Sequence, residues 1–397
     1  MTITSRAVRR QRHDVDDRPF IVIWEVTRAC QLACLHCRAD AITRRNPFEL
    51  TLDEGKRLLD GIAAFPAPHP IVVLTGGDPF ERPDLADLVR YGTEIGLSVA
   101  LSPSVTPNVT DERLHELREA GAKAVSLSLD GARAETHDAF RGIDGTYAAT
   151  RDAADRVLAA GFRLQVNSTV TRATVVELPA LLRDVIELGA LLWSVFFLVP
   201  TGRGQQLQAL SADETEDVLH WLVDVSKHIA IKTTEAPHYR RVVLQREQMA
   251  ADGIDHTPDR GPLYHQLTEA TRTELAGAAI RERPPRPPID VNSGRGFMFI
   301  DHMGKVYPSG FLPQVAGDVR KTPVTDIYRQ AEIMRRLRTP EGFGGKCGVC
   351  EFRDVCGGSR SYAFAATGDP LEADPSCSYV PPAWRDEQAR LGGLPVA

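Results

Sequence analysis

The chain has 397 residues, of which 43% are hydrophobic and 25% charged, and its formal net charge is −6. These values are ordinary for a globular protein, and the acidic balance gives no support to general nucleic-acid binding, which usually shows as a basic excess. No run approaches the roughly 18 consecutive apolar residues of a membrane span. Residues 1–19 are polar and arginine-rich, without the apolar core of a secretory signal. We therefore expect a disordered lead-in at 1–19, a cytoplasmic protein, and neither a nucleic-acid nor a membrane partner.

The seven cysteines fall into two groups that lie far apart in the sequence. Three stand between residues 30 and 37, and four between residues 347 and 377. A disulfide framework usually scatters its cysteines and favours an even number. Clustered cysteines in a cytosolic chain indicate metal binding instead. We expect one metal centre from each group.

The apolar run Phe20–Trp24 predicts a buried strand, and the first cysteine group follows it in a loop. Cys30, Cys34 and Cys37 have the spacing C-x3-C-x2-C. Three thiolates can hold three irons of a cubane iron–sulfur cluster and leave the fourth iron without a protein ligand. An open iron can bind a substrate or cofactor, as the open position of a catalytic zinc does. The alternative is a zinc site completed by His36, but His36 directly precedes Cys37 and could hardly reach the same metal.

From residue 20 to about residue 230, apolar runs alternate with segments that repeat apolar residues at helical spacing. Continuous apolar strands separated by helices are typical of a parallel sheet buried on both faces. Six such units predict an α/β fold, a partial (β/α)6 TIM-like barrel, with its chemistry at the C-terminal ends of the strands. The strands predicted after the first are Ile71–Leu74, Leu97–Leu101, Val125–Leu129, Leu164–Val170 and Leu191–Val199.

The alternation stops at about residue 235, where a helical insertion begins that ends in a proline-rich stretch, 281–288. Such a proline run is typical of a stiff, extended connector. We hypothesise that Arg240 and Arg241 of the insertion receive an acidic substrate. The expected division is a barrel at 20–235, the insertion and connector at 236–290, a C-terminal cluster domain at 291–380 and a tail at 381–397.

Polar motifs follow the predicted strands. The second strand is followed by Gly76-Gly77-Asp78-Pro79, where two glycines allow the backbone to approach a ligand and expose carbonyls that accept from an ammonium group. Ser128 and Asp130 follow the fourth strand, and Asp130 is as well explained by a capping carboxylate at a turn. Asn167 lies on the fifth strand. Arg203, in a glycine-rich loop after the sixth, could face a cofactor, a substrate or solvent.

The C-terminal part begins with a predicted hairpin at 296–310, which turns at Met303-Gly304. The second cysteine group follows it. Four thiolates complete the ligand set of a cubane cluster, and they would equally satisfy a structural zinc. The residues alone leave both possibilities open for Cys347, Cys350, Cys356 and Cys377.

The first cysteine group resembles the signature of the radical S-adenosylmethionine (radical SAM) enzymes, in which an aromatic residue or histidine, here His36, precedes the last cysteine. The resemblance implies a [4Fe-4S] cluster at Cys30, Cys34 and Cys37 that binds S-adenosylmethionine (SAM) at its open iron. One electron then cleaves SAM and releases a 5′-deoxyadenosyl radical.

Further residues are assigned by the same resemblance. Gly76-Gly77-Asp78-Pro79 is similar to the family's Gly-Gly-Glu-Pro motif, which holds the amino group of SAM. The stretch Leu127–Gly131 and the following Arg141-Gly142 resemble a region in which a serine and an arginine contact the ribose or carboxylate of SAM. This implies binding roles for Ser128 and Arg141.

The C-terminal segment resembles the SPASM extension of these enzymes, which usually carries seven cysteines and two auxiliary clusters. The ligands of one auxiliary [4Fe-4S] cluster are all present, as Cys347, Cys350, Cys356 and Cys377. The other cluster needs cysteines where this chain has Ser309 and Arg360. We therefore predict a single auxiliary cluster, which accepts or relays an electron or orders the substrate cavity.

Three C-terminal phrases, Tyr307–Pro313, Gly345–Glu351 and Cys356–Arg360, look most like those of alternative haem and haem d1 biosynthesis. There, hydrogen abstraction from a propionate side chain of a tetrapyrrole leads to oxidative decarboxylation or loss of the side chain. The alternative is a maturase that crosslinks, oxidises or epimerises a ribosomally made peptide. Only about 19 residues precede the first strand, so no leader-peptide-binding domain is expected there.

The resemblance therefore implies an oxidoreductase or lyase that forms 5′-deoxyadenosine and acts on a small molecule or a peptide. It also implies a one-electron donor such as flavodoxin or ferredoxin. A carrier of electrons with two clusters is the non-enzymatic alternative. The glycine-rich motif and the polar residues at the strand ends weigh against such a carrier, because electron transfer requires neither.

Overall fold

The computed structural model describes residues 7–9, 14–254, 260–278 and 280–390. Within these residues the strands form one ten-stranded sheet in the order β10-β9-β8-β1-β2-β3-β4-β5-β6-β7. Strands β1 to β7 run parallel to one another. Strand β8 pairs parallel with β1 and antiparallel with β9, and β10 pairs antiparallel with β9. The strands are β1 (Ile21–Glu25), β2 (Ile71–Thr75), β3 (Ser98–Leu101), β4 (Ala124–Ser128), β5 (Arg163–Val170), β6 (Leu192–Phe197), β7 (Ala230–Thr234), β8 (Phe297–Ile300), β9 (Lys305–Tyr307) and β10 (Gly317–Asp318).

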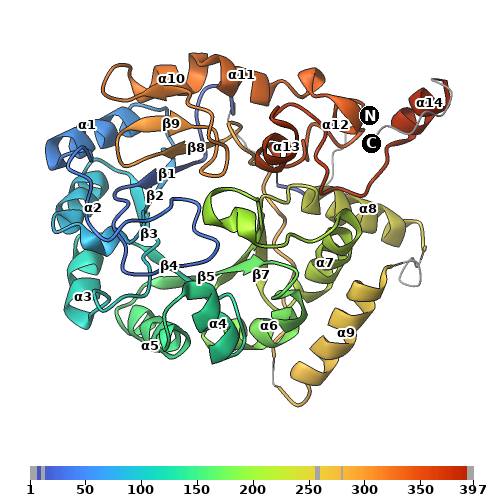
Figure 1. Cartoon of the computed structure of the whole chain (residues 1–397), viewed down its shortest axis with the longest axis horizontal. Coiled ribbons are helices and arrows are strands. Elements are labelled where there is room, and N and C mark those ends of the chain that lie inside the picture. Colours follow the sequence, from blue (N-terminus) through green and yellow to red (C-terminus); the bar gives the residue numbers. More distant parts are fainter. Residues whose placement is uncertain (1–6, 10–13, 255–259, 279, 391–397) are drawn as a thin grey trace.

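Helices cover the outer face of the curved sheet (Figure 1). None of the helices within the described ranges is long and apolar enough to cross a membrane. The helices are α1 (Leu52–Ala63), α2 (Leu85–Glu94), α3 (Asp111–Glu119), α4 (Ala134–Arg141), α5 (Thr146–Ala159), α6 (Leu178–Glu187), α7 (Ala212–Val225), α8 (Tyr239–Ala251), α9 (Pro262–Glu274), α10 (Val324–Gln330), α11 (Glu332–Arg338), α12 (Gly345–Gly348), α13 (Arg360–Thr367) and α14 (Pro382–Arg390), with short 3₁₀ turns η1 (Pro79–Glu81), η2 (Val175–Glu177), η3 (Gly202–Gln206) and η5 (Pro340–Gly342).

Capping residues explain where two of the outer helices begin. At α1, the Thr51 hydroxyl accepts from the Glu54 N–H at 3.3 Å, and the Glu54 carboxylate accepts from the Thr51 N–H at 2.9 Å. Ser211 and Glu214 make the same reciprocal pair at α7. Each pair satisfies two N–H groups that would otherwise lack a partner at a helix start.

The predicted fold class, α/β with a partial TIM-like barrel, is confirmed. All six predicted strands are present, with ends that differ by at most two residues. The structure adds β7, which pairs with β6. Sequence patterning missed β7 because only the first two of its residues, Ala230 and Ile231, are apolar.

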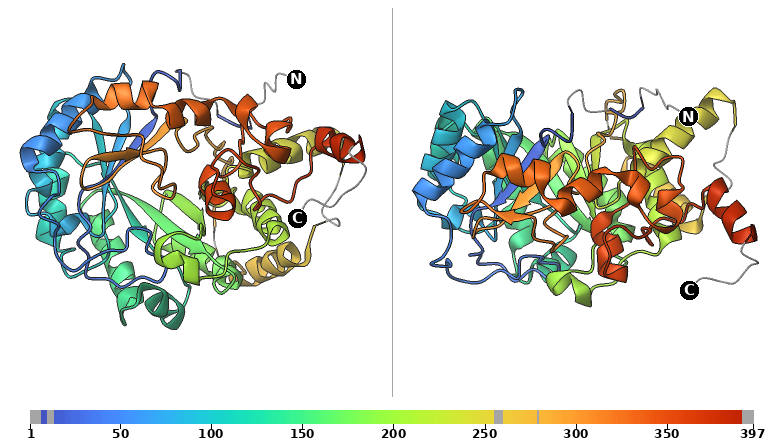
Figure 2. Two further views of the ribbon diagram at one scale, coloured as in Figure 1. Left: turned by 45° about the horizontal axis from the view of Figure 1, so that its top comes forward. Right: turned by 90° about the horizontal axis from the view of Figure 1, so that it is seen from above.

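The C-terminal hairpin is also confirmed, as β8 and β9 pair antiparallel. Strand β8 has a second partner, because it also pairs parallel with β1, Ile21 opposite Phe297. The sheet is therefore continuous across residue 291, where the sequence suggested a separate domain. The later C-terminal elements run along one side of the sheet from β9 towards α8 (Figures 1 and 2).

The expected disorder of the lead-in is wrong for the residues of it that the structure describes. Val8 is buried against Leu244 and Val355. Arg18 is also buried, and its Nη1 donates to the Pro68 carbonyl at 2.6 Å. The packing of Val8 and the hydrogen bonds that Arg18 donates to backbone carbonyls hold this part of the lead-in against the folded chain. Residues 1–6 and 10–13, and 391–397 of the expected tail, lie outside the described residues.

Alternation along β6 and β7 separates an outer face from an inner one. Trp193 packs edge-to-face on Trp221 of α7, with ring centroids 6.1 Å apart, so Trp193 faces outwards. The neighbouring Ser194 and Lys232 therefore face inwards. The strand register aligns a row of polar residues across β4, β5, β6 and β7, namely Ser128, Asn167, Ser194 and Lys232.

Candidate active site

The first cysteine group lies in the loop between β1 and α1. The backbone bonds this loop to the end of α4, where the Leu35 N–H donates to the Phe140 carbonyl at 2.9 Å. Cys30 and Cys34 are buried and Cys37 is partly buried. The loop thus has a defined shape at the C-terminal end of β1, where the sequence placed it.

Polar hydrogens point at two of the three sulfurs in this loop. The Leu32 N–H donates to Cys30 Sγ at 3.3 Å, and Arg141 Nη1 donates to Cys34 Sγ at 3.7 Å. Such bonds favour the charged form of a thiolate ligand. In the described part of the chain, no three His, Cys, Asp or Glu side chains lie close enough together to hold a single metal ion. Three thiolates with N–H and cationic donors fit the ligand set of an iron–sulfur cluster held by three cysteines.

The two glycines after β2 pack directly on the cysteine loop. A Cβ at Gly76 would lie 2.5 Å from the Thr27 carbonyl oxygen, and one at Gly77 would lie 2.4 Å from the Ala29 carbonyl oxygen. The Gly77 N–H donates to that Thr27 carbonyl at 2.9 Å. From the sequence we expected glycine here because a ligand approaches the backbone. In the structure, the segment that approaches Gly76 and Gly77 is the backbone that precedes Cys30.

Asp78, the third residue of this motif, is buried. Its carboxylate accepts from the Thr106 hydroxyl at 2.7 Å and from the Phe80 N–H at 3.1 Å, which caps η1. Burial raises the pKa of Asp78 to about 6. The side chain therefore stabilises the turn that Pro79 begins, and the backbone before it is the part that faces the cysteine loop.

A hollow of about 230 Å³ lies beside the cysteine loop. Ser128 from the end of β4 and Arg141 from the end of α4 both line it, so the structure brings together two residues that the sequence singled out. Ser104 also lines the hollow, and its hydroxyl donates to the Gly77 carbonyl at 2.7 Å. Its other lining residues are Leu32, Pro103, Val105, His137, Thr146 and Thr150.

Asp130 orients Arg141. The Arg141 guanidinium forms a buried ion pair with the Asp130 carboxylate, which also accepts from the Thr169 N–H at 2.7 Å. Burial raises the pKa of Asp130, but the Arg141 charge and its other partners outweigh this and hold the pKa below its usual value. The simple turn cap considered from the sequence is therefore not the role of Asp130.

His36 belongs to the cysteine loop, and Arg203 lies against it. The His36 ring stacks on Phe140 with centroids 4.5 Å apart, and burial lowers its pKa to about 4, so the ring is neutral at neutral pH. The Arg203 N–H donates to the Cys37 carbonyl at 3.1 Å. Arg203 Nε and Nη2 are buried and have no acceptor among the described residues. These two groups are available to a bound molecule.

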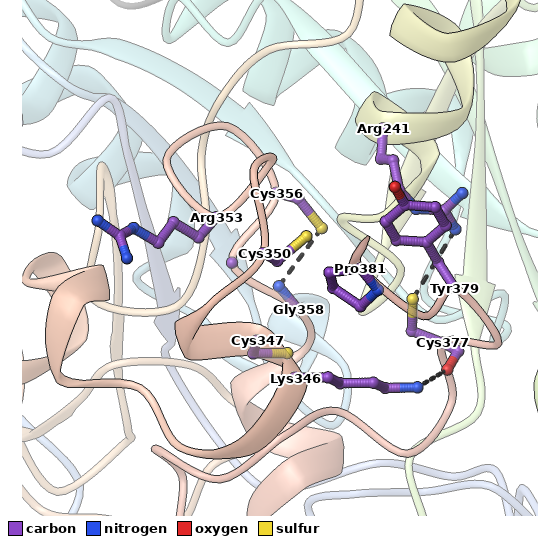
Figure 3. A pocket seen from close by; sticks show the side chains of 11 residues that line it. Arg241, Lys346, Cys347, Cys350, Arg353, Cys356, Gly358, Cys377, Tyr379 and Pro381 are labelled. Carbon is purple, nitrogen blue, oxygen red and sulfur yellow. Dashed lines mark hydrogen bonds between the residues drawn. The ribbon is translucent and has the colours of Figure 1, made fainter. Parts of the chain in front are cut away.

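The second cysteine group surrounds another hollow, of about 360 Å³ (Figure 3). Arg360 donates to Cys347 Sγ at 3.5 Å, and the Gly358 N–H donates to Cys356 Sγ at 3.4 Å. All four cysteines line this hollow, Cys347, Cys350, Cys356 and Cys377. Four converging sulfurs with cationic and N–H donors fit a buried iron–sulfur cluster.

The hypothesis that Arg240 and Arg241 receive an acidic substrate is wrong in this structure. Arg240 is buried and donates to two backbone carbonyls, the nearer being that of Val355 at 2.7 Å. Arg241 pairs with Glu216, donates to Cys377 Sγ at 3.8 Å, and lies over the Tyr379 ring (Figure 3). Their charges serve the second cysteine group and the packing around it.

The two positions that lack cysteine are filled by bonded side chains. The Ser309 hydroxyl donates to the Glu235 carboxylate at 2.9 Å, as do the hydroxyls of Ser359 and Ser361 at 2.6 and 3.0 Å. Burial raises the pKa of Glu235 despite these donors. Arg360 is buried and donates to the Pro370 carbonyl at 3.0 Å. This arrangement fits a single auxiliary cluster.

Sequence reasoning missed several residues of the site. Ser104 was overlooked because β3 carries no recognisable motif after it, although the short Ser-Pro-Ser stretch at 102–104 is a strand-end signal of the same kind as Ser128. Lys232 was overlooked together with β7. Glu235 directly follows that strand and has a left-handed φ of 60°, which a sequence does not reveal.

Comparisons with known proteins agree with this geometry. A family model, the radical SAM superfamily, matches residues 24–184. The chain is 40% identical over 365 residues to an AdoMet-dependent heme synthase of Methanosarcina barkeri, and the match covers 91% of this chain and 97% of that protein. It is 28% identical over 381 residues to an Fe-coproporphyrin III synthase of the same organism, covering 91% of this chain and 88% of that protein.

Among solved structures, Streptococcus suis SuiB bound to the precursor peptide SuiA is similar with a TM-score of 0.65. The match covers 91% of this chain and 76% of SuiB, and the sequences are 14% identical. At that identity the similarity shows a shared fold and nothing of the substrate.

We predict that Gly77→Ala displaces the cysteine loop, because the new Cβ would lie 2.4 Å from the Ala29 carbonyl oxygen. The expected cost is about 1–3 kcal/mol of stability, together with a lower iron content after anaerobic reconstitution. Thermal unfolding and iron analysis measure both. The control is Gly342→Ala, whose Cβ meets no atom within 4 Å. Equal iron content and stability in the two variants would contradict this account of the glycine.

Iron and sulfide analysis of the reconstituted protein is expected to give about eight iron atoms per chain, from two cubane clusters. Replacing Cys347, Cys350 and Cys377 together by alanine should leave about four. Ser309→Ala should leave the iron count unchanged, because Ser309 bonds to a carboxylate. About twelve iron atoms per chain, or a loss of iron in Ser309→Ala, would show that a second auxiliary cluster exists.

Proposed function

The chain belongs to the radical SAM superfamily, and we propose that it decarboxylates propionate side chains of a haem-type iron tetrapyrrole by hydrogen abstraction. The chain is an enzyme of this superfamily. The observation that carries the substrate proposal is its similarity to the Methanosarcina heme synthase along nearly the full length of both proteins. The peptide-modifying alternative has weaker support, namely a shared fold with SuiB and 29% identity to a mycofactocin maturase of Mycobacterium tuberculosis, against 40% identity to the heme synthase.

The cofactors of the family are a [4Fe-4S] cluster and SAM, and Cys30, Cys34 and Cys37 are the residues that would hold the cluster. When bound, the cluster and SAM supply a 5′-deoxyadenosyl radical able to take hydrogen from an unactivated carbon. The protein contributes binding, orientation and exclusion of water. His36 contributes to the last of these, because its neutral ring stacks on Phe140 beside Cys37.

Ser128 and Arg141 are the residues we assign to SAM binding, in the hollow beside the cysteine loop. Arg141 Nε is buried and has no acceptor among the described residues, although the same guanidinium already pairs with Asp130. A free donor on a fixed guanidinium suits a carboxylate such as that of SAM. We assign the SAM amino group to the Gly76–Pro79 backbone, which Asp78 holds in place through its own hydrogen bonds.

The proposed reaction removes one hydrogen atom, one further electron and CO₂ from each propionate that reacts. The C–H bond of the ring-side carbon and the bond to the carboxylate both break, and the two chain carbons form a vinyl double bond. The electron requires a one-electron acceptor. We further propose that the protein works in the cytoplasm, and that a flavodoxin or ferredoxin supplies the electron consumed with each SAM.

We predict that Arg141→Met lowers both stability and SAM affinity. It leaves the buried Asp130 carboxylate without its cation, which costs about 3–5 kcal/mol. Adding Asp130→Asn should restore much of the stability, because no buried charge remains, but not the SAM affinity. Thermal unfolding and equilibrium dialysis with SAM separate the two effects. Parent-like SAM affinity in Arg141→Met would contradict the assignment.

The reaction itself is tested by incubating the reconstituted protein anaerobically with SAM, dithionite and iron coproporphyrin III. We expect 5′-deoxyadenosine, and a porphyrin product lighter by CO₂ and two hydrogen atoms for each side chain converted. Liquid chromatography with mass spectrometry detects both. Formation of 5′-deoxyadenosine with an unaltered porphyrin would overturn the tetrapyrrole proposal while leaving the enzyme class intact.

A further inference from the structure

Three donors without partners lie close together on the inner face of β6 and β7. Ser194 and Lys232 are opposite each other in the strand register, and Thr234 follows Lys232 by two residues, on the same face. The inner face of β6 also carries Phe196, which contacts Phe311 of the C-terminal segment at 6.4 Å between centroids. This face is therefore turned towards the space between the sheet and the C-terminal part.

The two hydroxyls are buried without hydrogen bonds. Ser194 is completely buried, and neither its Oγ nor Thr234 Oγ1 has a hydrogen-bond partner among the described residues. An unpaired buried hydroxyl costs free energy that a hydrogen bond to a bound group would offset. Two such hydroxyls on adjacent strands indicate a bound acceptor.

Lys232 lacks an anion. Within the part of the chain that the structure describes, its Nζ has no hydrogen bond or ion pair. Burial lowers the pKa of Lys232, and the nearby Arg286 of the proline-rich connector lowers it further. The charge that acts on Lys232 from a neighbouring element is thus another cation. A carboxylate between these groups would satisfy Lys232 and both hydroxyls at once.

We propose that Ser194, Lys232 and Thr234 bind a carboxylate of the substrate that does not react, and so select substrates with several carboxylate side chains. The proposal rests on the proposed function and adds a residue set that decides substrate specificity. The row Ser128, Asn167, Ser194 and Lys232 connects this site to the SAM-side hollow.

The two ends of that row lie three strand spacings apart, roughly 14 Å at 4.8 Å each. A molecule held at Lys232 by one carboxylate must be wide to place another side chain beside the cofactor at Ser128. A tetrapyrrole, with propionates on different rings, has this form. Lys232 is accordingly a positioning residue, and the reacting atoms lie at the other end of the row.

Lys232→Met tests the proposal, with iron coproporphyrin III as substrate and Lys123→Met as the control. Lys123 is an exposed lysine that directly precedes β4. We expect the KM of Lys232→Met to rise about tenfold to a hundredfold, because a contact between opposite charges is lost. The kcat should change less. Formation of 5′-deoxyadenosine without porphyrin should equal that of the parent, and Lys123→Met should match the parent throughout.

A second measurement separates carboxylate binding from a structural role. The parent is expected to bind iron coproporphyrin III much more tightly than its tetramethyl ester, as measured by absorbance titration. Lys232→Met should lose most of this preference, and Lys232→Arg should keep it. Ser194→Ala removes only one hydroxyl, so it should lose a smaller part of the preference for the acid over the ester. This variant replaces Lys232→Met in the test if Lys232→Met does not fold.

The possible failures are distinguishable. If the parent neither binds nor converts iron coproporphyrin III, the proposed function is wrong and this inference falls with it. If the parent converts the porphyrin and Lys232→Met has the parent's KM and the parent's preference for acid over ester, the carboxylate site alone is wrong.

Discussion

The backbone contact between the glycine loop after β2 and the cysteine loop after β1 is the constraint on which the site depends. The Thr27 and Ala29 carbonyls approach Gly76 and Gly77 so closely that no Cβ fits between them. Adjacent parallel strands bring the two loops to the same edge of the sheet. Because the two loops are in close backbone contact, the position of the segment that carries Cys30 is fixed relative to the end of β2.

Four cations near the proposed binding sites differ in the contacts that they make. Arg141 and Arg241 each pair with a buried or partly buried carboxylate and also donate towards a cysteine sulfur. They stabilise the two cysteine groups. Arg203 keeps two buried donors with no acceptor among the described residues, and Arg141 and Arg241 keep one each. Lys232 has no hydrogen bond or ion pair there. A buried donor without an acceptor is costly unless a bound molecule completes it, so we expect a bound molecule beside Arg141 and Arg203, and the unpaired charge of Lys232 suits an anion on the inner face of β7.

The sequence predicted the features that depend on local pattern. Apolar runs gave the strands β1 to β6, and cysteine spacing gave both groups of sulfurs. It did not predict features that depend on how distant segments meet. The pairing of β8 with β1 joins residues 276 positions apart, such as Ile21 and Phe297, and the burial of Arg240 depends on a carbonyl of Val355. Strand β7 was not predicted because its inward-facing Lys232 and Thr234 are polar. The same two polar residues are part of the proposed carboxylate site.

The enzymatic account rests on one claim, that Cys30, Cys34 and Cys37 would hold three irons of a cluster and leave its fourth iron open to SAM. Electron paramagnetic resonance of the reconstituted, dithionite-reduced protein tests it most directly, in a variant whose second cysteine group has been replaced by alanine. We predict a reduced [4Fe-4S] signal whose g-values shift when SAM is added. A signal that SAM leaves unchanged, or bound zinc in place of a cluster, would contradict the account.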